Sequence, residues 1–294
     1  MLPRSPDESH PSSAGGLALD DAEFDLLRAL IHELTGIALG RGKRDVLGRR
    51  LARRLRATGK DTLAAYCAWV RSLSPQADEV AELINCATTN TTGFFREPEH
   101  FEFLRTQLFP ALELRARNGR ERRVRLWSAA CSSGEEPYSL AMTAAEYFAG
   151  ADWKVEILAT DVDTDVLARA RAAVYPAERV ESLPPETVRR HFLSGKGNFA
   201  GHYKLRPELA ELVRFERLNF LDERWWVDAR FDAILCRNVV IYFEPRTQEE
   251  LFRRLHAHLA EDGYLIVGRS ERVRALGELF EALPGSVHRR RASS

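Results

Sequence analysis

Cysteine is scarce in this 294-residue sequence, and its four cysteines form no Cys-x-x-Cys pair. Cys67, Cys86, Cys131 and Cys236 are scattered, so the sequence predicts neither a zinc site nor a disulfide framework. No apolar run approaches the roughly 20 residues that a membrane helix needs, and the N-terminus lacks the apolar core of a signal peptide. These absences predict a soluble protein of the reducing cytoplasm that holds no metal and does not insert into a membrane.

An excess of charge of either sign is also missing. The sequence has 43 basic and 43 acidic residues, so no general attraction draws the protein to nucleic acid. Hydrophobic residues make up 45% and charged residues 29%, which is typical of a globular protein with a proper core. A chain of this length predicts about two domains.

The first part of the sequence predicts a tail and a small helical domain. Residues 1–17 are rich in proline, serine and glycine, so we expect a disordered tail. Residues 18–87 show only helical periodicity, and Asp20 and Gly36 are suited to start and end the first helix. The four expected helices cover residues 20–36, 43–58, 62–73 and 77–87.

Residues 88–294 alternate between strand and helix patterns, which predicts a Rossmann-like α/β domain with a mostly parallel sheet. The expected strands are 124–129, 155–159, 213–218, 231–236 and 264–268. The expected helices are 99–116, 136–148, 164–173 and 245–260. Between about 175 and 212 the alternation stops, and three glycines there predict a small inserted β subdomain. After the folded domain we expect only a short arginine-rich tail, residues 288–294, and no appended partner-binding domain.

Residues 128–139, with the sequence SAACSSGEEPYS, form the most informative segment. It follows an apolar run and precedes a helix pattern, and this strand–loop–helix order is where α/β folds hold a cofactor. Glu135 and Glu136 would repel a phosphate, which favours backbone amides and positive charge. They suit a cofactor that carries hydroxyls or a cation. S-adenosylmethionine carries both, so the segment predicts a methyltransferase.

A carboxylate follows the second strand of the expected sheet. Asp161 is placed to accept hydrogen bonds from both ribose hydroxyls of an adenosine, because ligands of open α/β sheets bind beyond the carboxyl ends of the strands. The alternative is that the acidic residues here cap the next helix. We assign that cap to Asp163 or Thr164 and the ribose to Asp161.

Two further strand ends carry candidate side chains. Asn219 and Phe220 follow the third strand and are candidates for binding the adenine or ribose, or else form a turn and part of the core. Asn238 and Tyr242 follow the fourth strand, where they would position the methionine part of the cofactor and the methyl acceptor. Alternatively, Tyr242 is a half-buried anchor beside an apolar core.

Two cationic features remain. Arg96 stands in an irregular segment, where it pairs with a carboxylate of the cofactor or substrate, or else forms a surface salt bridge. In the second helix, arginines and a lysine fall opposite the leucine face as one basic stripe: Arg49, Arg53, Arg56 and Lys60. A charge run is usually a solvated face, but one sign on one side also suits an acidic helix or nucleic acid.

At these segments the sequence resembles the CheR-type chemotaxis receptor methyltransferases, which are protein-glutamate O-methyltransferases. The matching stretches are TTNTTGFFRE (88–97), WSAACSSGEEPYS (127–139), ATDVDT (159–164) and CRNVVIYF (236–243). The resemblance covers the sequence from about residue 19 to near the C-terminus. It implies a helical N-terminal domain that docks the substrate, and an S-adenosylmethionine-dependent methyltransferase domain with a small β insertion.

The resemblance also implies site residues and partners. The family's cofactor contacts fall on these residues: Asn90, Thr92, Arg96, Glu136, Asp161, Asn219, Phe220, Asn238 and Val239. The family's basic helix approaches the helical, acidic methylation region in the cytoplasmic part of the receptor, which implies a docking role for Arg49, Arg53 and Arg56. In some members the β insertion also grips a peptide at the receptor's C-terminus. Residues 195–201 resemble that insertion, and whether they bind a peptide stays open.

The implied reaction needs no general base. A glutamate side chain has a pKa of about 4.3 and is already ionised at neutral pH, so Arg96 or Tyr242 would only orient it, and the product would be S-adenosylhomocysteine. Two other interpretations are kept. A nucleic-acid methyltransferase is suggested by residues 238–242, which loosely resemble an Asn-Pro-Pro-Tyr loop, although the prolines and a basic overall charge are missing. The other is a signalling module that binds the cofactor without catalysis.

Overall fold

The computed structural model describes residues 17–271 and 277–292 of the chain. Of the tail expected over residues 1–17, residues 1–16 lie outside the described residues. Leu17 itself is fixed in place, because its backbone N–H donates to the Gly48 carbonyl at 3.3 Å. Within the described ranges, no helix is both long enough and apolar enough to cross a membrane.

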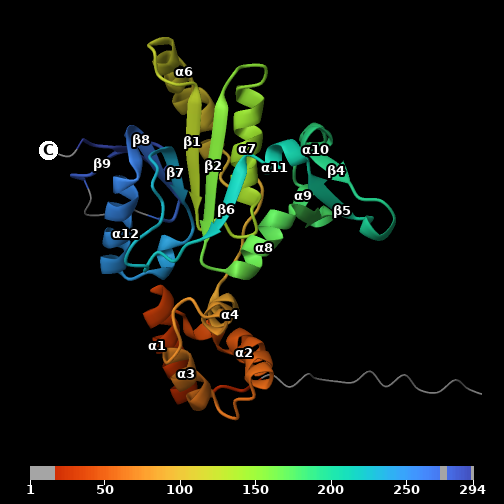
Figure 1. Cartoon of the computed structure of the whole chain (residues 1–294), viewed down its shortest axis with the longest axis vertical. Coiled ribbons are helices and arrows are strands. Elements are labelled where there is room, and N and C mark those ends of the chain that lie inside the picture. The colour runs from red at the N-terminus through yellow and green to blue at the C-terminus, as the bar shows by residue number, and fades with distance from the viewer. Residues whose placement is uncertain (1–16, 272–276, 293–294) are drawn as a thin grey trace, which may run out of the picture.

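Four helices form the N-terminal part of the structure, as the sequence predicts (Figure 1). They are α1 (Asp21–Thr35), α2 (Arg44–Thr58), α3 (Leu63–Arg71) and α4 (Asp78–Ala87), and a 3-10 turn, η1 (Arg41–Lys43), precedes α2. The first helix begins with a capping box between Asp20 and Glu23 and ends at Gly36 in the left-handed conformation. The helices enclose a core of their own that includes Leu27, Leu51 and other leucines.

A seven-stranded sheet forms the centre of the second part, in the order β6-β2-β1-β7-β8-β10-β9. The first five strands in this order are mutually parallel, and β10 is antiparallel to both of its neighbours. The parallel strands are β1 (Arg123–Ala129), β2 (Lys154–Asp161), β6 (Val213–Arg217), β7 (Phe231–Cys236) and β8 (Leu259–Val267). This is the mostly parallel α/β sheet that the alternating pattern predicts.

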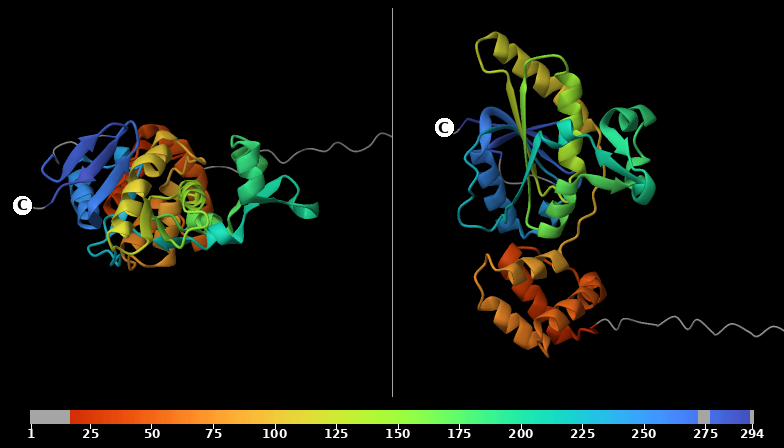
Figure 2. Two further views of the ribbon diagram at one scale, coloured as in Figure 1. Left: turned by 90° about the horizontal axis from the view of Figure 1, so that it is seen from above. Right: turned by 45° about the vertical axis from the view of Figure 1, so that its right-hand side comes forward.

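Helices cover both faces of the sheet (Figure 2). Leu126 and Trp127 are neighbours on β1 and belong to two different cores, because successive strand residues point to opposite faces. One core includes α7 (Glu135–Tyr147), α8 (Thr164–Ala172) and the helix over Glu99–Arg117; the other includes α12 (Pro245–Ala257). The helix expected at 99–116 consists of α5 (Glu99–Phe103) and α6 (Phe109–Arg117), joined through a π-helical stretch, Leu104–Leu108.

The expected arginine-rich tail is wrong. Val287–Arg290 forms strand β10, which pairs with β8 and with β9 (Phe280–Leu283). Val287 is buried opposite Ile266. Two four-residue strands, one of them with three basic residues, carry too little apolar pattern to stand out in a sequence.

The inserted subdomain expected between about 175 and 212 is a three-stranded antiparallel sheet in the order β3-β5-β4. Its strands are β3 (Val174–Pro176), β4 (Phe192–Ser194) and β5 (His202–Leu205). Short helical turns connect them, α9 (Ala177–Val180), α10 (Pro185–His191) and η3 (Gly197–Phe199), and α11 (Pro207–Ala210) leads from β5 to β6 of the main sheet. The subdomain lies beside α7 and α8, and His191 Nε2 contacts the Glu146 carboxylate of α7 at 2.7 Å (Figure 1).

Candidate functional site

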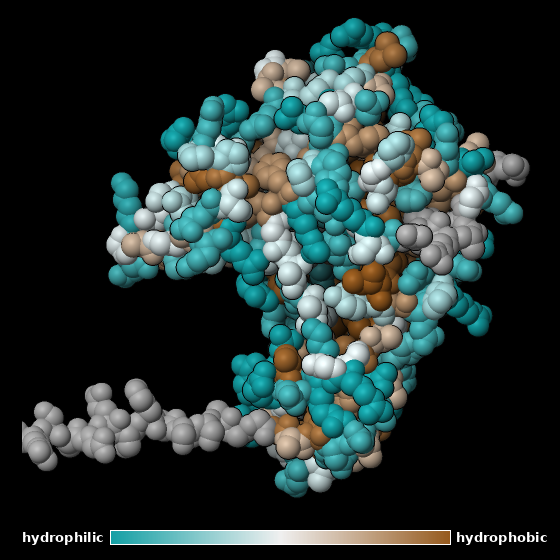
Figure 3. Space-filling view, turned by 180° about the vertical axis from the view of Figure 1, so that it is seen from behind, coloured by the Kyte–Doolittle hydropathy of each residue, from teal (hydrophilic) through white to brown (hydrophobic). Residues whose placement is uncertain are grey.

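A cavity opens where the helical part meets the carboxyl ends of β1, β2, β6 and β7. On the helical side its wall includes the segment that joins α1 to α2, from Thr35 to Lys43, and the end of α4 at Ala87. Seen from behind, the molecule narrows at this junction, and apolar side chains gather there (Figure 3). The position agrees with the rule that places ligands of open α/β sheets beyond the carboxyl ends of the strands.

The loop after β1 makes a sharp turn into α7. The N–H groups of Ala130 and Cys131 both donate to the Thr160 carbonyl, at 2.8 and 2.9 Å. Ala130 and Ser132 have φ values of 71° and 49°, in the left-handed region that non-glycine residues rarely adopt. Gly134 follows with a φ of 96°. Strained backbone of this kind is concentrated at binding sites, and here the loop lines the cavity.

Gly134 has no room for a side chain. A β-carbon there would lie 2.9 Å from the Ala170 Cβ and 2.9 Å from the Tyr175 hydroxyl oxygen. We therefore expect Gly134→Ala to lower the free energy of unfolding by about 2–5 kcal/mol, combining left-handed strain with overpacking. Gly119→Ala is the control, because Gly119 has a φ of 91° but a β-carbon added there would meet no atom within 4 Å; it should cost only about 1–2 kcal/mol. Urea denaturation measures both, and equal losses would contradict the steric argument.

Asp161 ends β2 with its carboxylate fixed in place. Its Oδ2 accepts from the Ser132 N–H at 2.8 Å and its Oδ1 from the Asp163 N–H at 3.0 Å. Burial raises the pKa of Asp161 to about 6, although these backbone hydrogen bonds oppose the shift. Asp163 is the N-cap of α8, as expected, since its Oδ1 accepts from the N–H groups of Asp165 and Val166. The capping role therefore falls on Asp163, and Asp161 lines the cavity.

The two glutamates after the loop face different surroundings. Glu136 lines the cavity and accepts hydrogen bonds from Ser128 Oγ at 2.7 Å and Arg237 at 2.8 Å. Burial raises its pKa, and Arg237 and Ser128 partly oppose that shift. Glu135 is buried, accepts from Ser133 Oγ at 2.7 Å and does not line the cavity. Of this acidic pair, only Glu136 is placed to meet a ligand.

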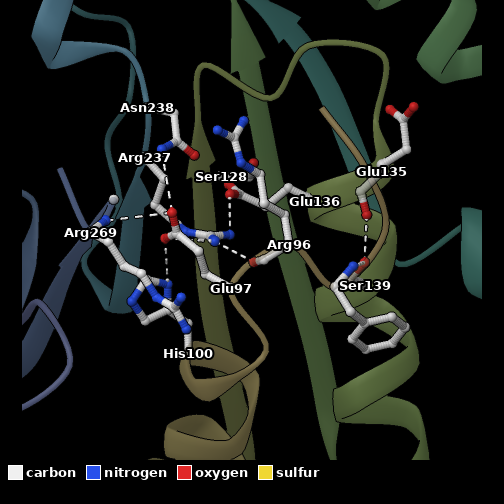
Figure 4. Close-up of polar contacts among 12 residues, drawn as sticks. Arg96, Glu97, His100, Ser128, Glu135, Glu136, Ser139, Arg237, Asn238 and Arg269 are labelled. Atoms are coloured by element: carbon white, nitrogen blue, oxygen red, sulfur yellow. Dashed lines mark hydrogen bonds and ion pairs between the residues drawn. The ribbon is translucent and has the colours of Figure 1, made fainter. Parts of the chain in front are cut away.

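Arg237 is the main residue that the sequence analysis missed. Its side chain is 1% exposed and lies between Glu136 and Glu97, with a nitrogen 2.8 Å from the first carboxylate and 3.1 Å from the second (Figure 4). It also donates to the Arg96 carbonyl. Burial raises the pKa of Glu97, but the hydrogen bond and the charge of Arg237, together with Asn238 and His100, outweigh burial and hold that pKa below its usual range. The signal in the sequence is an arginine directly after a buried strand.

Within the described ranges Arg96 forms no surface salt bridge, one of its two expected roles, and its contact with a carboxylate of the cofactor or substrate stays a prediction. Its guanidinium is exposed and donates to the Thr91 carbonyl at 3.0 Å, and in the part of the chain that the structure describes it takes part in no ion pair. Asn90 and Thr92 lie on the same segment. The Asn90 amide donates to Asp163 at 2.7 Å, and the Thr92 carbonyl accepts from Arg179 at 2.8 Å. The side chain of Arg96 thus keeps donors available at the cavity.

The strand ends of β6 and β7 complete the lining. Asn219 forms the expected turn with Leu221 N and also donates to the Leu34 carbonyl of α1 at 2.7 Å, while Phe220 borders the cavity. Asn238 has a φ of 59° and lines the cavity together with Val239 and Tyr242. Tyr242 is half-buried, and its carbonyl accepts from Ala38 N at 2.8 Å.

The cavity therefore gathers every expected cofactor residue, from Asn90 to Val239, together with Tyr242. The contacts of these residues with a cofactor stay predictions. The expected docking arginines lie elsewhere, exposed on α2. Among the residues with described positions, no group of three or more His, Cys, Asp or Glu side chains is close enough to hold a metal ion.

Comparison with known proteins agrees with this geometry. A family described as "CheR methyltransferase, SAM binding domain" matches residues 90–288, and "CheR methyltransferase, all-alpha domain" matches residues 22–88. The chain belongs to the CheR methyltransferase family. The SAM binding domain of CheR proteins spans every cavity residue that the sheet contributes, and the all-alpha domain spans the segment that closes the cavity from the other side.

Curated CheR relatives match over most of their length. The chain is 42% identical to the chemotaxis protein methyltransferase of Salmonella typhimurium, covering 87% of this chain and 85% of that protein. It is 42% identical to the Escherichia coli protein of the same name, covering 90% of this chain and 89% of that one. It is 40% identical to chemotaxis protein methyltransferase 2 of Pseudomonas aeruginosa, covering 90% and 92%. This CheR chain is an S-adenosylmethionine-dependent methyltransferase.

Proposed function

We propose that this protein transfers a methyl group from S-adenosylmethionine to glutamate side chains of chemoreceptors, giving glutamate 5-O-methyl esters and S-adenosylhomocysteine. The relatives are named as chemotaxis protein methyltransferases, which supports a role in receptor adaptation. The observation that carries the proposal is the cavity itself, which joins the strand ends of a methyltransferase sheet to a helical domain with a free basic face.

The cavity residues fit the cofactor by the chemistry of their free groups. Asp161 keeps acceptor capacity on both oxygens beyond its two backbone hydrogen bonds, which suits two ribose hydroxyls. Phe220 offers an apolar surface to the adenine, with Asn219 at its edge. Glu136 supplies negative charge for the amino group, and the exposed guanidinium of Arg96 supplies donors for the carboxylate. The rest of the proposed cofactor-binding surface consists of Asn90, Thr92, Asn238 and Val239.

The bound cofactor supplies an electrophilic methyl group, and the protein needs only to align the acceptor with it. The acceptor glutamate, with a pKa of about 4.3, is ionised at neutral pH and needs no base. Arg96 and Tyr242 lie at the cavity on different segments and orient the carboxylate in this proposal. In this proposal the wall from Thr35 to Lys43 covers the reacting groups and limits the access of water, and alignment provides most of the rate.

The basic face of α2 suits the acidic helical region of a receptor. Arg50 and Arg54 are used within the protein: the first donates to the Cys86 carbonyl, and the second pairs with Glu79 and Glu82. The docking arginines 49, 53 and 56 are exposed, and no ion pair involves them within the described ranges. Their charge is therefore available to a partner. A receptor C-terminal peptide on the β insertion is a second proposed contact.

Transfer of radiolabelled methyl from S-adenosylmethionine into membranes with chemoreceptors of the same cell tests the function. A base-labile label on a receptor band is the expected result, because carboxylate esters hydrolyse in base. Label that is lost on nuclease treatment would instead indicate a nucleic-acid substrate. Tight cofactor binding with no label on any receptor would contradict the proposal and favour a module without catalysis.

The proposed ribose contact predicts a pH dependence. The pKa of Asp161 is raised to about 6, and only the ionised carboxylate accepts hydrogen bonds from both hydroxyls. As the pH falls from 7 to 5, most of the free protein becomes protonated at this site, so the cofactor Kd should rise about tenfold. Calorimetric titration of S-adenosylhomocysteine at each pH measures this rise. In Asp161→Asn the Kd should be high at both pH values; an unchanged slope in that variant would assign the dependence to another group.

A further inference from the structure

Glu271 is a buried carboxylate close to the cavity but outside its lining. It follows strand β8 and is 5% exposed. Three backbone N–H groups converge on it. Those of Asn238 and Gly268 donate to its Oε2, each at 2.7 Å, and that of Val240 donates to its Oε1 at 2.8 Å. Across residues 17–271 and 277–292 no cation pairs with it, so these amides are its hydrogen-bond partners there.

Two of the three donors belong to the loop that ends β7 and lines the cavity. Asn238 is in the left-handed conformation, with a φ of 59°, which asparagine adopts more readily than other non-glycine residues but which is still uncommon. The third donor, Gly268, directly follows β8, and a β-carbon there would lie 2.5 Å from the Asn238 amide nitrogen and 2.9 Å from Glu271 Oε2. The carboxylate therefore ties the ends of two neighbouring parallel strands together.

The anchored loop carries the groups that face the ligand. Asn238 and Val239 line the cavity, and Tyr242 follows in the 3-10 turn η4 (Val240–Tyr242). Gln248 of α12 supports the same turn from outside, since its amide donates to the carbonyls of Val240 and Phe243, both at 2.9 Å. The amide of Gln248 thus holds the carbonyls of this loop, and the carboxylate of Glu271 holds backbone N–H groups of the same loop.

We propose that Glu271 is a positioning residue for methyl transfer: it fixes the backbone of residues 238–240, so that Asn238, Val239 and Tyr242 face the cofactor and the acceptor. It acts through the loop and touches neither ligand. A carboxylate suits this role because both of its oxygens accept, whereas glutamine turns an NH2 group toward at least one N–H donor and leaves that donor without a partner. The kinetic part of this inference rests on the proposed function; the backbone and cofactor parts do not.

Glu271→Gln in the full chain tests the proposal with three readouts. Hydrogen exchange of at least one of the Asn238 and Val240 amides should speed up about tenfold or more, because they donate to different oxygens of Glu271, and the Kd of S-adenosylhomocysteine should rise about tenfold, as losing a hydrogen bond to a charged group predicts. The kcat should fall about 10- to 100-fold, with the KM for the receptor little changed. Glu261→Gln, the same change at an exposed position on β8, should leave all three at wild-type values.

A stability-matched control separates positioning from general weakening. Leu209→Ala removes a buried side chain in the β insertion, away from the cavity, and should lower the melting temperature without changing the Kd or the kcat. If Glu271→Gln loses as much stability but keeps the wild-type Kd and kcat, the positioning role is wrong. Glu271→Asp keeps the charge on a side chain that is one methylene shorter, so exchange, Kd and kcat should change in the same directions but by less. If all three stay at wild-type values in Glu271→Asp, the proposal is overturned even if Glu271→Gln does not fold. If Glu271→Gln lowers cofactor affinity but the wild-type protein methylates no receptor, the proposed function is refuted and the positioning of the loop by Glu271 is not.

Discussion

Arg237→Ala should lower the free energy of unfolding by about 3–5 kcal/mol, the usual cost of removing one partner of a buried ion pair. The guanidinium is 1% exposed and neutralises two carboxylates, Glu97 and Glu136, whose own side chains are 13% exposed. Without it both carboxylates must stay charged beside each other in a largely buried site, or take up a proton. Cofactor affinity should fall as well, because Glu136 lines the cavity.

The pH dependence of this loss gives a second check. In the wild type Arg237 holds the pKa of Glu97 below its usual value, so that carboxylate stabilises the fold at neutral pH and loses this contribution in acid. In Arg237→Ala both carboxylates have raised pKa values, so the folded variant binds protons and its deficit should shrink as the pH falls from 7 toward 5.

Urea denaturation at both pH values measures the deficit. Arg115→Ala serves as the control, because Arg115 pairs with the half-exposed Asp262 at 3.1 Å and such pairs contribute at most about 1 kcal/mol. A loss for Arg237→Ala no larger than for Arg115→Ala would show that the buried network is not what holds this part of the protein together.

Reversing the charge of the α2 face should abolish most receptor methylation and spare cofactor binding. In the triple variant Arg49→Glu, Arg53→Glu, Arg56→Glu, we expect kcat/KM for the receptor to fall about 100-fold, since three attractive surface contacts become repulsive. None of these residues lines the cavity, so the Kd of S-adenosylhomocysteine should stay within about twofold of the wild-type value. The wild-type rate should also decrease as salt is added.

A matched control exists at the opposite end of the molecule. Arg117, Arg120 and Arg122 are also exposed, near the start of β1, and changing all three to glutamate alters the net charge by the same amount. That variant should methylate receptors at close to the wild-type rate. Equal losses in the two triple variants would point to overall charge, and no loss in either would remove α2 from the docking surface.

The fold is largely predictable because its signals are local. Asp20, Gly36 and the leucine spacing define α1 and α2 within a few residues of chain. The parallel strands are buried apolar runs, and their carboxyl ends carry the polar residues that line the cavity. Strand β10 escapes prediction because only Val287 of its four residues is buried.

The residues that line the cavity are partly predictable from the sequence, whereas the contacts they make within the protein are not. Arg237 lies 140 positions from Glu97 in the chain, and Glu271 lies 33 positions from Asn238, so nothing local indicates either contact. The separate fates of Glu135 and Glu136 depend on a helix starting at Glu135, which directs adjacent side chains about 100° apart. The turn at Asn219 is a local feature, whereas its bond to the Leu34 carbonyl depends on where α1 packs.

The wall formed by Thr35 to Lys43 has a consequence for how such proteins diversify. The helical domain carries the face proposed to select the receptor, and the loop between its first two helices also borders the cofactor. A graft of the helical domain from a relative would therefore bring a foreign wall into the cavity, and chimaeras should inherit target preference and cofactor affinity together. The two matched regions, 22–88 and 90–288, are separate in sequence but line one cavity, so we expect an exchange of either region to change the cofactor site.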